Sequence, residues 1–373
     1  MRILTFFDGS IIQALPKTKL KAQKIFCLRQ KAFCGTIQAS KNAGEGAINH
    51  VRIYGTLGPA CRDPEILKQM LAEGMSGMRL NLSHATLKDA SGLLEAYRRA
   101  ADACGVRPEL LIDMQGPELR IGALDTPIPL SVGDVLEADA LPFPENVRDA
   151  LNTAAFGQEI LLDDGKILLT AEQSGKLKVV RGGVLLSRKS VALPGIAIPS
   201  PAMTDADREH IRTAKEYGVT AVMQPFVRGK EDLIEVRGEL DRAGGREIRL
   251  LAKIESKTGI AHLHELIPFC DEIVIARGDL GNAVPLWVLP VVQKRIAAVC
   301  RDSGREFMVV TQMLDSMTHR PVPTRAEVSD IFNAVLDGAS SVMLTGETAS
   351  GDYPVQSIRY LVKTVREAEA FLG

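Results

Sequence analysis

The sequence contains few aromatic residues and almost no net charge. Phe, Trp and Tyr make up 5% of the 373 residues, and the formal charge at pH 7 is −1. Nucleic-acid-binding domains usually carry a basic excess that pairs with phosphates, so this composition excludes an electrostatic argument for a nucleic-acid partner. No apolar run approaches the ~20 residues that a helix needs to cross a bilayer, and we therefore expect no membrane span.

The chain also lacks the cysteine spacing of a disulfide or zinc framework. Its six cysteines are dispersed and include no C-x-x-C pair: Cys27, Cys34, Cys61, Cys104, Cys270 and Cys300. Dispersed cysteines are typical of reduced thiols, and we therefore expect a cytoplasmic protein.

Basic residues are concentrated at the start of the chain. Residues 1–50 contain eight Lys and Arg against Asp8 and Glu45, a surplus of six, so the remaining residues carry −7. A transit peptide, a loosely ordered tail and translation from an early start codon all give such a pattern. We expect 1–50 to be a poorly ordered basic extension.

From Val51 onward, short apolar runs alternate with amphipathic helical segments, the pattern of a parallel sheet. Strands are predicted at 51–56, 77–82, 109–113, 219–223, 248–254, 272–276, 307–311 and 340–345. Helices are predicted at 63–73, 87–104, 205–217, 286–303 and 325–337. Eight strands with intervening helices indicate an α/β fold, a (β/α)8 TIM barrel, formed by 51–121 and 196–373.

Residues 122–195 break this rhythm. They contain short β-like runs separated by turn signals such as Asp164-Gly165 and Gly182-Gly183. We predict a small all-β domain inserted after the third barrel strand, at the end of the barrel where a lid over an active site would lie.

Charged side chains follow the predicted strands. Lys253 and Glu255 end the fifth strand, and Arg277-Gly278-Asp279 follows the sixth. Carboxylates at adjoining strand ends suit Mg²⁺, and a lysine beside them suits a phosphoryl group in transit. Four other predicted strands also end in polar residues. Arg79, Asn81 and Ser83 lie at the end of the second, Asp113 at the end of the third, Thr311 at the end of the seventh and Glu347 at the end of the eighth. Active sites of TIM barrels lie at this rim.

These segments resemble the pyruvate kinase family over about 52–370. The similar motifs include Met78-Arg79-Leu80-Asn81-Leu82-Ser83-His84, Asp113-Met114-Gln115-Gly116-Pro117-Glu118, Lys253-Ile254-Glu255, Ala276-Arg277-Gly278-Asp279-Leu280-Gly281, Thr311-Gln312-Met313-Leu314 and Gly346-Glu347-Thr348. Several motifs in the same order make the resemblance specific.

The resemblance implies phosphoryl transfer from phosphoenolpyruvate to ADP, giving pyruvate and ATP, a step of glycolysis. Glu255 and Asp279 would hold Mg²⁺ or Mn²⁺. Lys253 would stabilise the phosphoryl group, and Gly278 and Asp279 would bind the substrate carboxylate through their backbone. Thr311 would line the substrate pocket and assist protonation, and Glu347 would lie near the route of that proton.

The resemblance also implies further ligands. Asn81, Ser83, Asp113 and the carbonyl of Met114 occupy the positions of K⁺ ligands. Glu118 is similar to potassium-dependent relatives, whereas Met114, Gln115 and Ile121 are similar to relatives that manage without it; we expect K⁺ binding. For the nucleotide, the basic positions are Arg79, His84 and Lys189.

Some features depart from the family. Thr345 replaces a usual Ser, and Asn282-Ala283 replaces an apolar-acidic pair. We interpret the chain as a short form without the C-terminal effector domain, and expect a monomer or a homodimer formed through the barrel. Two other readings stay open: a lyase acting on phosphoenolpyruvate or a 2-oxoacid, and a non-catalytic relative that binds metabolites.

Overall fold

The structure is a computed structural model that describes residues 6–7, 10–11 and 50–373, except for His84, Asp164, Ala197 and Pro199. The chain divides into two compact units, Met1–Asn49 and His50–Gly373. In the first unit, β1 (Phe6–Phe7) pairs antiparallel with β2 (Ser10–Ile11); the rest of the predicted basic extension up to Asn49 lies outside the described residues. In the part of the chain that is described, no helix is both long and apolar enough to span a membrane.

Eight parallel strands of the second unit close into a barrel, which confirms the predicted fold class. Along the chain they are β3 (Arg52–Thr56), β4 (Gly77–Asn81), β5 (Glu109–Asp113), β13 (Ala221–Gln224), β14 (Arg249–Ile254), β15 (Glu272–Ala276), β16 (Glu306–Val310) and β17 (Ser341–Met343). Each pairs with the next along the chain, and β17 pairs with β3 to close the sheet, with Ser341 opposite Arg52.

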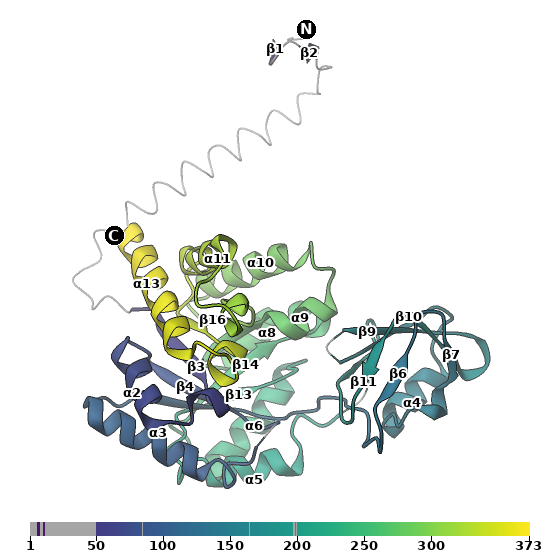
Figure 1. The fold of residues 1–373 in the computed structure, drawn as a ribbon, viewed down its shortest axis with the longest axis horizontal. Coiled ribbons are helices and arrows are strands. Elements are labelled where there is room, and N and C mark those ends of the chain that lie inside the picture. The colour runs from purple at the N-terminus through teal and green to yellow at the C-terminus, as the bar shows by residue number, and fades with distance from the viewer. Residues whose placement is uncertain are drawn as a thin grey trace. The chain divides into compact units, whose positions relative to one another are not determined.

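Helices surround the strands (Figure 1). They are α2 (Pro64–Ala72), α3 (Ser91–Cys104), α5 (Asp205–Thr213), α6 (Lys230–Arg242), α7 (Lys257–Ala261), α8 (Leu263–Leu266), α9 (Arg277–Ala283), α10 (Leu289–Asp302), α11 (Arg325–Leu336), α12 (Gly346–Ala349) and α13 (Pro354–Leu372). The helix predicted from residue 87 begins at Ser91, because residues 87–90 form turns. Helix α6 was assigned no range from the sequence, although the alternating pattern requires a helix there.

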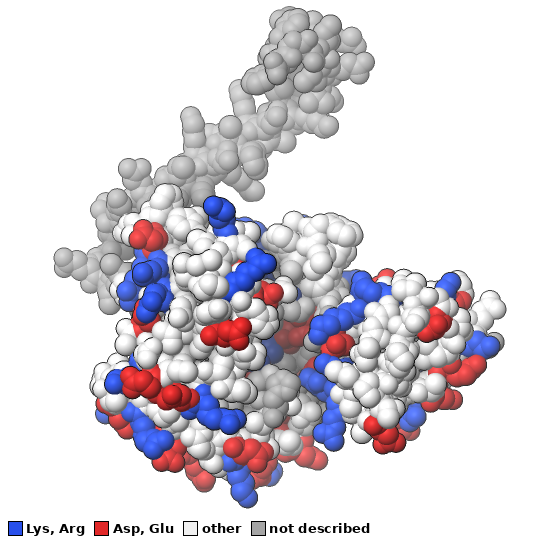
Figure 2. Space-filling view, viewed as in Figure 1, with Lys and Arg blue, Asp and Glu red and all other residues white. Residues whose placement is uncertain are grey.

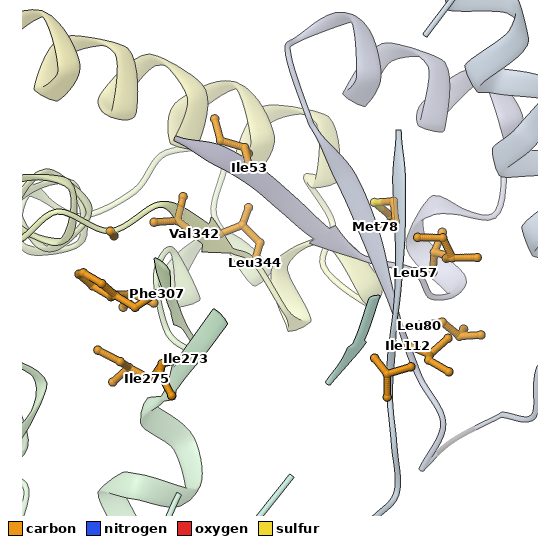
Figure 3. Packing of buried hydrophobic residues seen from close by; sticks show 14 of the residues in the cluster. Ile53, Leu57, Met78, Leu80, Ile112, Ile273, Ile275, Phe307, Val342 and Leu344 are labelled. Atoms are coloured by element: carbon orange, nitrogen blue, oxygen red, sulfur yellow. The ribbon is translucent and has the colours of Figure 1, made fainter. Parts of the chain in front are cut away.

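Two apolar layers stabilise the barrel. Large side chains such as Tyr54, Leu111, Met308 and Met343 belong to a separate buried cluster contributed by the strands alone, as expected for a filled barrel interior. A larger cluster joins the strands to the helices, and Figure 3 shows part of it: Ile53, Leu57, Met78, Leu80, Ile112, Ile273, Ile275, Phe307, Val342 and Leu344. Burial on both faces explains the continuous apolar runs of these strands.

The segment between β5 and β13 has its own sheets. Its strands are β6 (Ile128–Leu130), β7 (Val135–Glu137), β8 (Glu159–Leu162), β9 (Ile167–Ala171), β10 (Lys176–Arg181), β11 (Gly183–Leu185) and β12 (Val191–Ala192). β12-β8-β9-β10-β7 form one sheet and β11-β6 another. The segment also contains α4 (Glu145–Asn152), whose Val147 is fully buried, so the expectation of an all-β insertion was wrong in this detail.

A network of charges fills the amino-terminal end of the barrel. Arg249 pairs with Glu109 and, at 3.2 Å, with Glu272 Oε2. Arg52 NH2 lies 3.1 Å from the same Glu272 oxygen and 2.6 Å from Glu306 Oε2. Because Glu272 is completely buried, these arginines provide the compensation that a buried carboxylate requires.

Candidate functional site

At the carboxyl end of the barrel, Asp113 joins the two cations that the sequence placed there. Lys253 Nζ donates to Asp113 Oδ1 at 3.2 Å and to Oδ2 at 3.1 Å. Arg79 donates to Asp113 Oδ2 through Nε at 2.9 Å and NH2 at 2.5 Å. The three residues come from β14, β5 and β4; β4 and β5 are neighbours, and β13 lies between β5 and β14 at the same rim of the barrel.

Burial and charge act on this cluster in opposite directions. Burial raises the pKa of Asp113, but Lys253 and Arg79 outweigh burial and hold that pKa below its usual range. Burial lowers the pKa of Lys253, but the carboxylates of Asp113 and Glu255 outweigh it and raise that pKa. Lys253 therefore stays an ammonium throughout the physiological range, able to attract a phosphoryl group.

Glu255 is almost fully buried, and its two carboxylate oxygens differ. Oε2 accepts from Phe226 N at 2.7 Å. Oε1 lies 3.0 Å from Lys253 Nζ, yet within the described residues it forms no hydrogen bond of good geometry. Burial raises the pKa of Glu255 to about 7; Lys253 lowers it and Asp279 raises it. An underused buried carboxylate oxygen near a second carboxylate fits a divalent cation.

Glu255 and Asp279 line the same cavity. The cavity measures about 370 Å³, and its other walls include Phe226 and Arg228 after β13, and Ser190 to Ile196 of the insertion. In Figure 2 the surface is hollowed between the barrel and the insertion. No group of three His, Cys, Asp or Glu is arranged for a metal in the described ranges. Two carboxylates can hold Mg²⁺, which is usually bound through one or two carboxylates together with substrate oxygens.

Thr311 lies against Gly278. A Cβ built on Gly278 would be 3.3 Å from Thr311 Cγ2. Thr311 and Gln312 both have a positive φ, at 78° and 54°, a conformation that costs energy for a non-glycine residue. Arg277 holds this turn by donating to Thr311 O through Nε at 3.1 Å and NH2 at 2.8 Å.

Glu347 is buried, and backbone groups occupy its carboxylate. Oε1 accepts from Leu314 N at 3.0 Å and Oε2 from Thr345 N at 2.7 Å. These bonds join the segments after β16 and β17. The contacts therefore show that Glu347 fixes these two segments, and its predicted place near a proton route stays a prediction.

The structure brings the predicted K⁺ ligands near one another, and the side-chain oxygens of two of them, Asn81 and Asp113, already accept hydrogen bonds. Asn81 is paired with Asp113 in the sheet register, and its Oδ1 accepts from Ser83 N at 3.1 Å. Both Asp113 carboxylate oxygens are bound by Lys253 and Arg79. Met114 is buried directly after β5.

Of the predicted nucleotide residues, Arg79 belongs to the cluster described above. Lys189 lies in the insertion, where its Nζ is 2.8 Å from Asp163 Oδ1. The neighbouring Ser190 lines the cavity. His84 lies outside the described residues.

Three supporting residues escaped the sequence analysis. Thr56 Oγ1 accepts from Arg79 NH1 at 3.3 Å, and Phe226 N orients Glu255. Asp207 accepts from Gln115 N at 2.8 Å and Gly116 N at 3.0 Å, which fixes the turn after β5. Asp207 had a local signal, the capping box Thr204-x-x-Asp207 at the start of α5.

Comparison with known proteins gives a single answer. Residues 48–358 match the family model for the pyruvate kinase barrel domain. A pyruvate kinase of Aeropyrum pernix is 38% identical over 322 residues, 84% of this chain and 69% of the relative. One of Mycobacterium intracellulare is 37% identical over 85% of this chain and 70% of the relative. A pyruvate kinase of Geobacillus stearothermophilus is 35% identical over 86% of this chain and 57% of the relative. The chain belongs to the pyruvate kinase family.

Proposed function

We propose that this chain catalyses Mg²⁺-dependent phosphoryl transfer from phosphoenolpyruvate to ADP, giving pyruvate and ATP. The observation that carries the proposal is the buried Lys253, held between Asp113 and Glu255 at the rim of a barrel of this family. Phosphoryl transfer depends mainly on positioning and on neutralising charge, and this cluster supplies both.

Each side chain has a separate task in the proposed reaction. Lys253 attracts the phosphoryl oxygens as charge moves between donor and acceptor. Arg79 approaches the phosphates from the β4 side, and Asp113 orients both cations through its two oxygens. The backbone N–H groups of Gly278 and Asp279 bind the substrate carboxylate.

Glu255 and Asp279 would hold Mg²⁺ or Mn²⁺, which supplies positive charge to the phosphate and carboxylate oxygens of the substrate. The buried, underused Oε1 of Glu255 supports this assignment. K⁺ binding by Asn81, Ser83, Asp113 and the Met114 carbonyl stays a prediction.

Protonation of the enolpyruvate product would take place beside Thr311. Its backbone is held by Arg277, and its side chain packs against Gly278, where the substrate carboxylate would bind. Glu347 fixes the two loops that border this route.

Closure of the insertion over the cavity would exclude water and bring Lys189 to the nucleotide phosphates, for which Arg79 and His84 are the other predicted basic residues. We propose a cytoplasmic location, supported by the described cysteines, all of which are unpaired: Cys61, Cys104, Cys270 and Cys300.

The test is pyruvate formation from phosphoenolpyruvate, ADP and Mg²⁺, with and without K⁺. Lys253→Ala should lower kcat by at least about 10³-fold, because it removes a cation aimed at the transferred group. Lys363→Ala, an exposed lysine of α13, is the matched control and should leave kcat unchanged. Binding of phosphoenolpyruvate without turnover by the wild-type chain would reject the kinase and favour the non-catalytic reading.

A further inference from the structure

A second cavity opens at the opposite end of the barrel. It measures about 670 Å³, within the range of small-molecule sites. Its walls come from α6, from the start of β14 and from the segments that precede β15 and β16. Because these are the amino-terminal ends of the strands, the cavity is separate from the candidate active site.

Part of the charge in this cavity is already compensated within the protein. Arg237 NH2 lies 3.0 Å from Asp271 Oδ2, and Arg249 is engaged by the buried network at the barrel end. Glu247 Oε1 lies 3.1 Å from Lys215 Nζ. These groups line the cavity, but their charges are already paired within the protein.

Two other arginines of the wall retain binding capacity. Arg246 is exposed and forms no ion pair with any described residue. Arg305 donates through NH1 to Asp271 O at 3.3 Å, but its Nε is buried and no described group accepts from it. Arg305 lines the cavity, so its guanidinium charge lies where an anion bound there could pair with it. Asp241, exposed on α6, is the opposing charge.

A glycine keeps the helical wall open. Gly238 lies in the interior of α6, where glycine is less stable than alanine. Packing does not require it, because a Cβ there would find only Arg242 NH2, 3.8 Å away, within 4 Å. Since Gly238 lines the cavity, the missing side chain enlarges the space available to a ligand.

Apolar surface lies beside the arginines. Ile234 is 49% exposed and Phe269 is 38% exposed, and both line the cavity. An exposed aromatic ring next to guanidinium groups matches a ligand with a charged end and an apolar or planar body.

We propose that this cavity binds a small organic phosphate. Arg246 and Arg305 hold the phosphate group through charge-assisted hydrogen bonds, and the body of the ligand rests on Phe269 and Ile234. The site is additional to the active site and does not depend on the proposed kinase activity.

The test is calorimetric titration of the full chain with phenyl phosphate, which combines a phosphate with a planar body. Arg246→Gln should weaken binding about tenfold, because it removes a charged hydrogen-bond donor. Asp241→Asn should strengthen binding by removing the opposing charge. Arg212→Gln, at an exposed arginine of α5, is the matched control and should bind like the wild type.

Gly238→Ala separates ligand binding from folding. It should raise the Tm, since alanine favours the helix, and yet weaken phenyl phosphate binding by filling the cavity. Lys253→Ala should leave phenyl phosphate binding intact while abolishing turnover. The proposed cavity site and the proposed kinase activity can therefore be rejected separately. Wild-type affinity in both Arg246→Gln and Gly238→Ala would overturn the site, and equal affinity for inorganic phosphate and phenyl phosphate would overturn the apolar contact.

Discussion

Asp113 is the residue on which both cations of the candidate site depend. Asp113→Asn removes the carboxylate that pairs with the largely buried Arg79 and leaves Lys253 with Glu255 alone, and we expect a loss of about 3–5 kcal/mol in the free energy of unfolding. Urea denaturation at pH 7 measures it. Asp352→Asn, which breaks the exposed pair with His319, should cost less than about 1 kcal/mol; equal losses would contradict the role of Asp113.

The sign of the pH dependence follows from the lowered pKa of Asp113. As pH falls, the unfolded chain binds this proton before the folded chain does. The stability that Asp113 contributes is therefore complete above its ordinary pKa and disappears as pH falls through its folded pKa. The difference between wild type and Asp113→Asn should narrow in acid, as denaturation at a series of pH values would show.

For single residues, the sequence analysis identified the charged side chains of the candidate site but not the neutral groups that bind them. Lys253, Glu255 and Arg79 were predictable because charged side chains at the ends of apolar strands stand out. The roles of Thr56 and of the backbone N–H of Phe226 were not, because the partners of a hydroxyl or an amide become visible only when strand ends and loops meet in the fold.

Among the elements, the start of α11 offers a clean test of a helix cap. Glu327 accepts from Thr324 and Ser316, and although burial raises its pKa, these hydrogen bonds lower it overall. Glu327→Gln should cost about 1 kcal/mol at pH 7. Because the folded pKa is lowered, that cost should shrink as pH falls below the ordinary value for Glu. Urea titrations at pH 7 and in acid check it; a cost independent of pH would reject the charged cap.

The turn after β5 depends on a glycine for two reasons that can be separated. Gly116 has φ +60°, and a Cβ on it would lie 2.3 Å from Pro225 Cγ. Gly105 has φ +65° with no heavy atom within 4 Å of its Cβ position. Gly105→Ala should therefore cost only the backbone strain, about 1 kcal/mol. Gly116→Ala should cost more and lower kcat/KM, because the turn follows directly on Asp113 at the end of β5. Thermal denaturation and initial rates measure both, and equal Tm losses would contradict the clash.

Element types were predictable because apolar periodicity records burial, whereas some boundaries were not. The pattern from residue 87 continues an apolar helix face, but the chain forms turns as far as Ala90 before α3 begins. Helix α4 was missed because its eight residues stand alone among strand-like runs, although their apolar positions follow a helical period.

On the scale of the whole molecule, the insertion and the barrel have separate cores. Leu169 is fully buried in a cluster made only of residues from Ile121 to Leu193. Leu169→Ala should cost about 2–5 kcal/mol locally. Hydrogen exchange should then accelerate in β8, β9 and β10 and stay slow in β14 and β15. Uniform acceleration across both would show that the two cores unfold together.

The pairing of β17 with β3 has a consequence for synthesis on the ribosome. Residues Ser341–Met343 complete the ring with Arg52–Tyr54, so the first barrel strand to emerge waits for the last. At roughly 5–20 residues per second, that interval is on the order of 15–60 s. Throughout it the nascent sheet has two open edges able to pair with other chains. A stalled or truncated translation product ending before Ser341 should therefore be a preferred client of ribosome-associated chaperones.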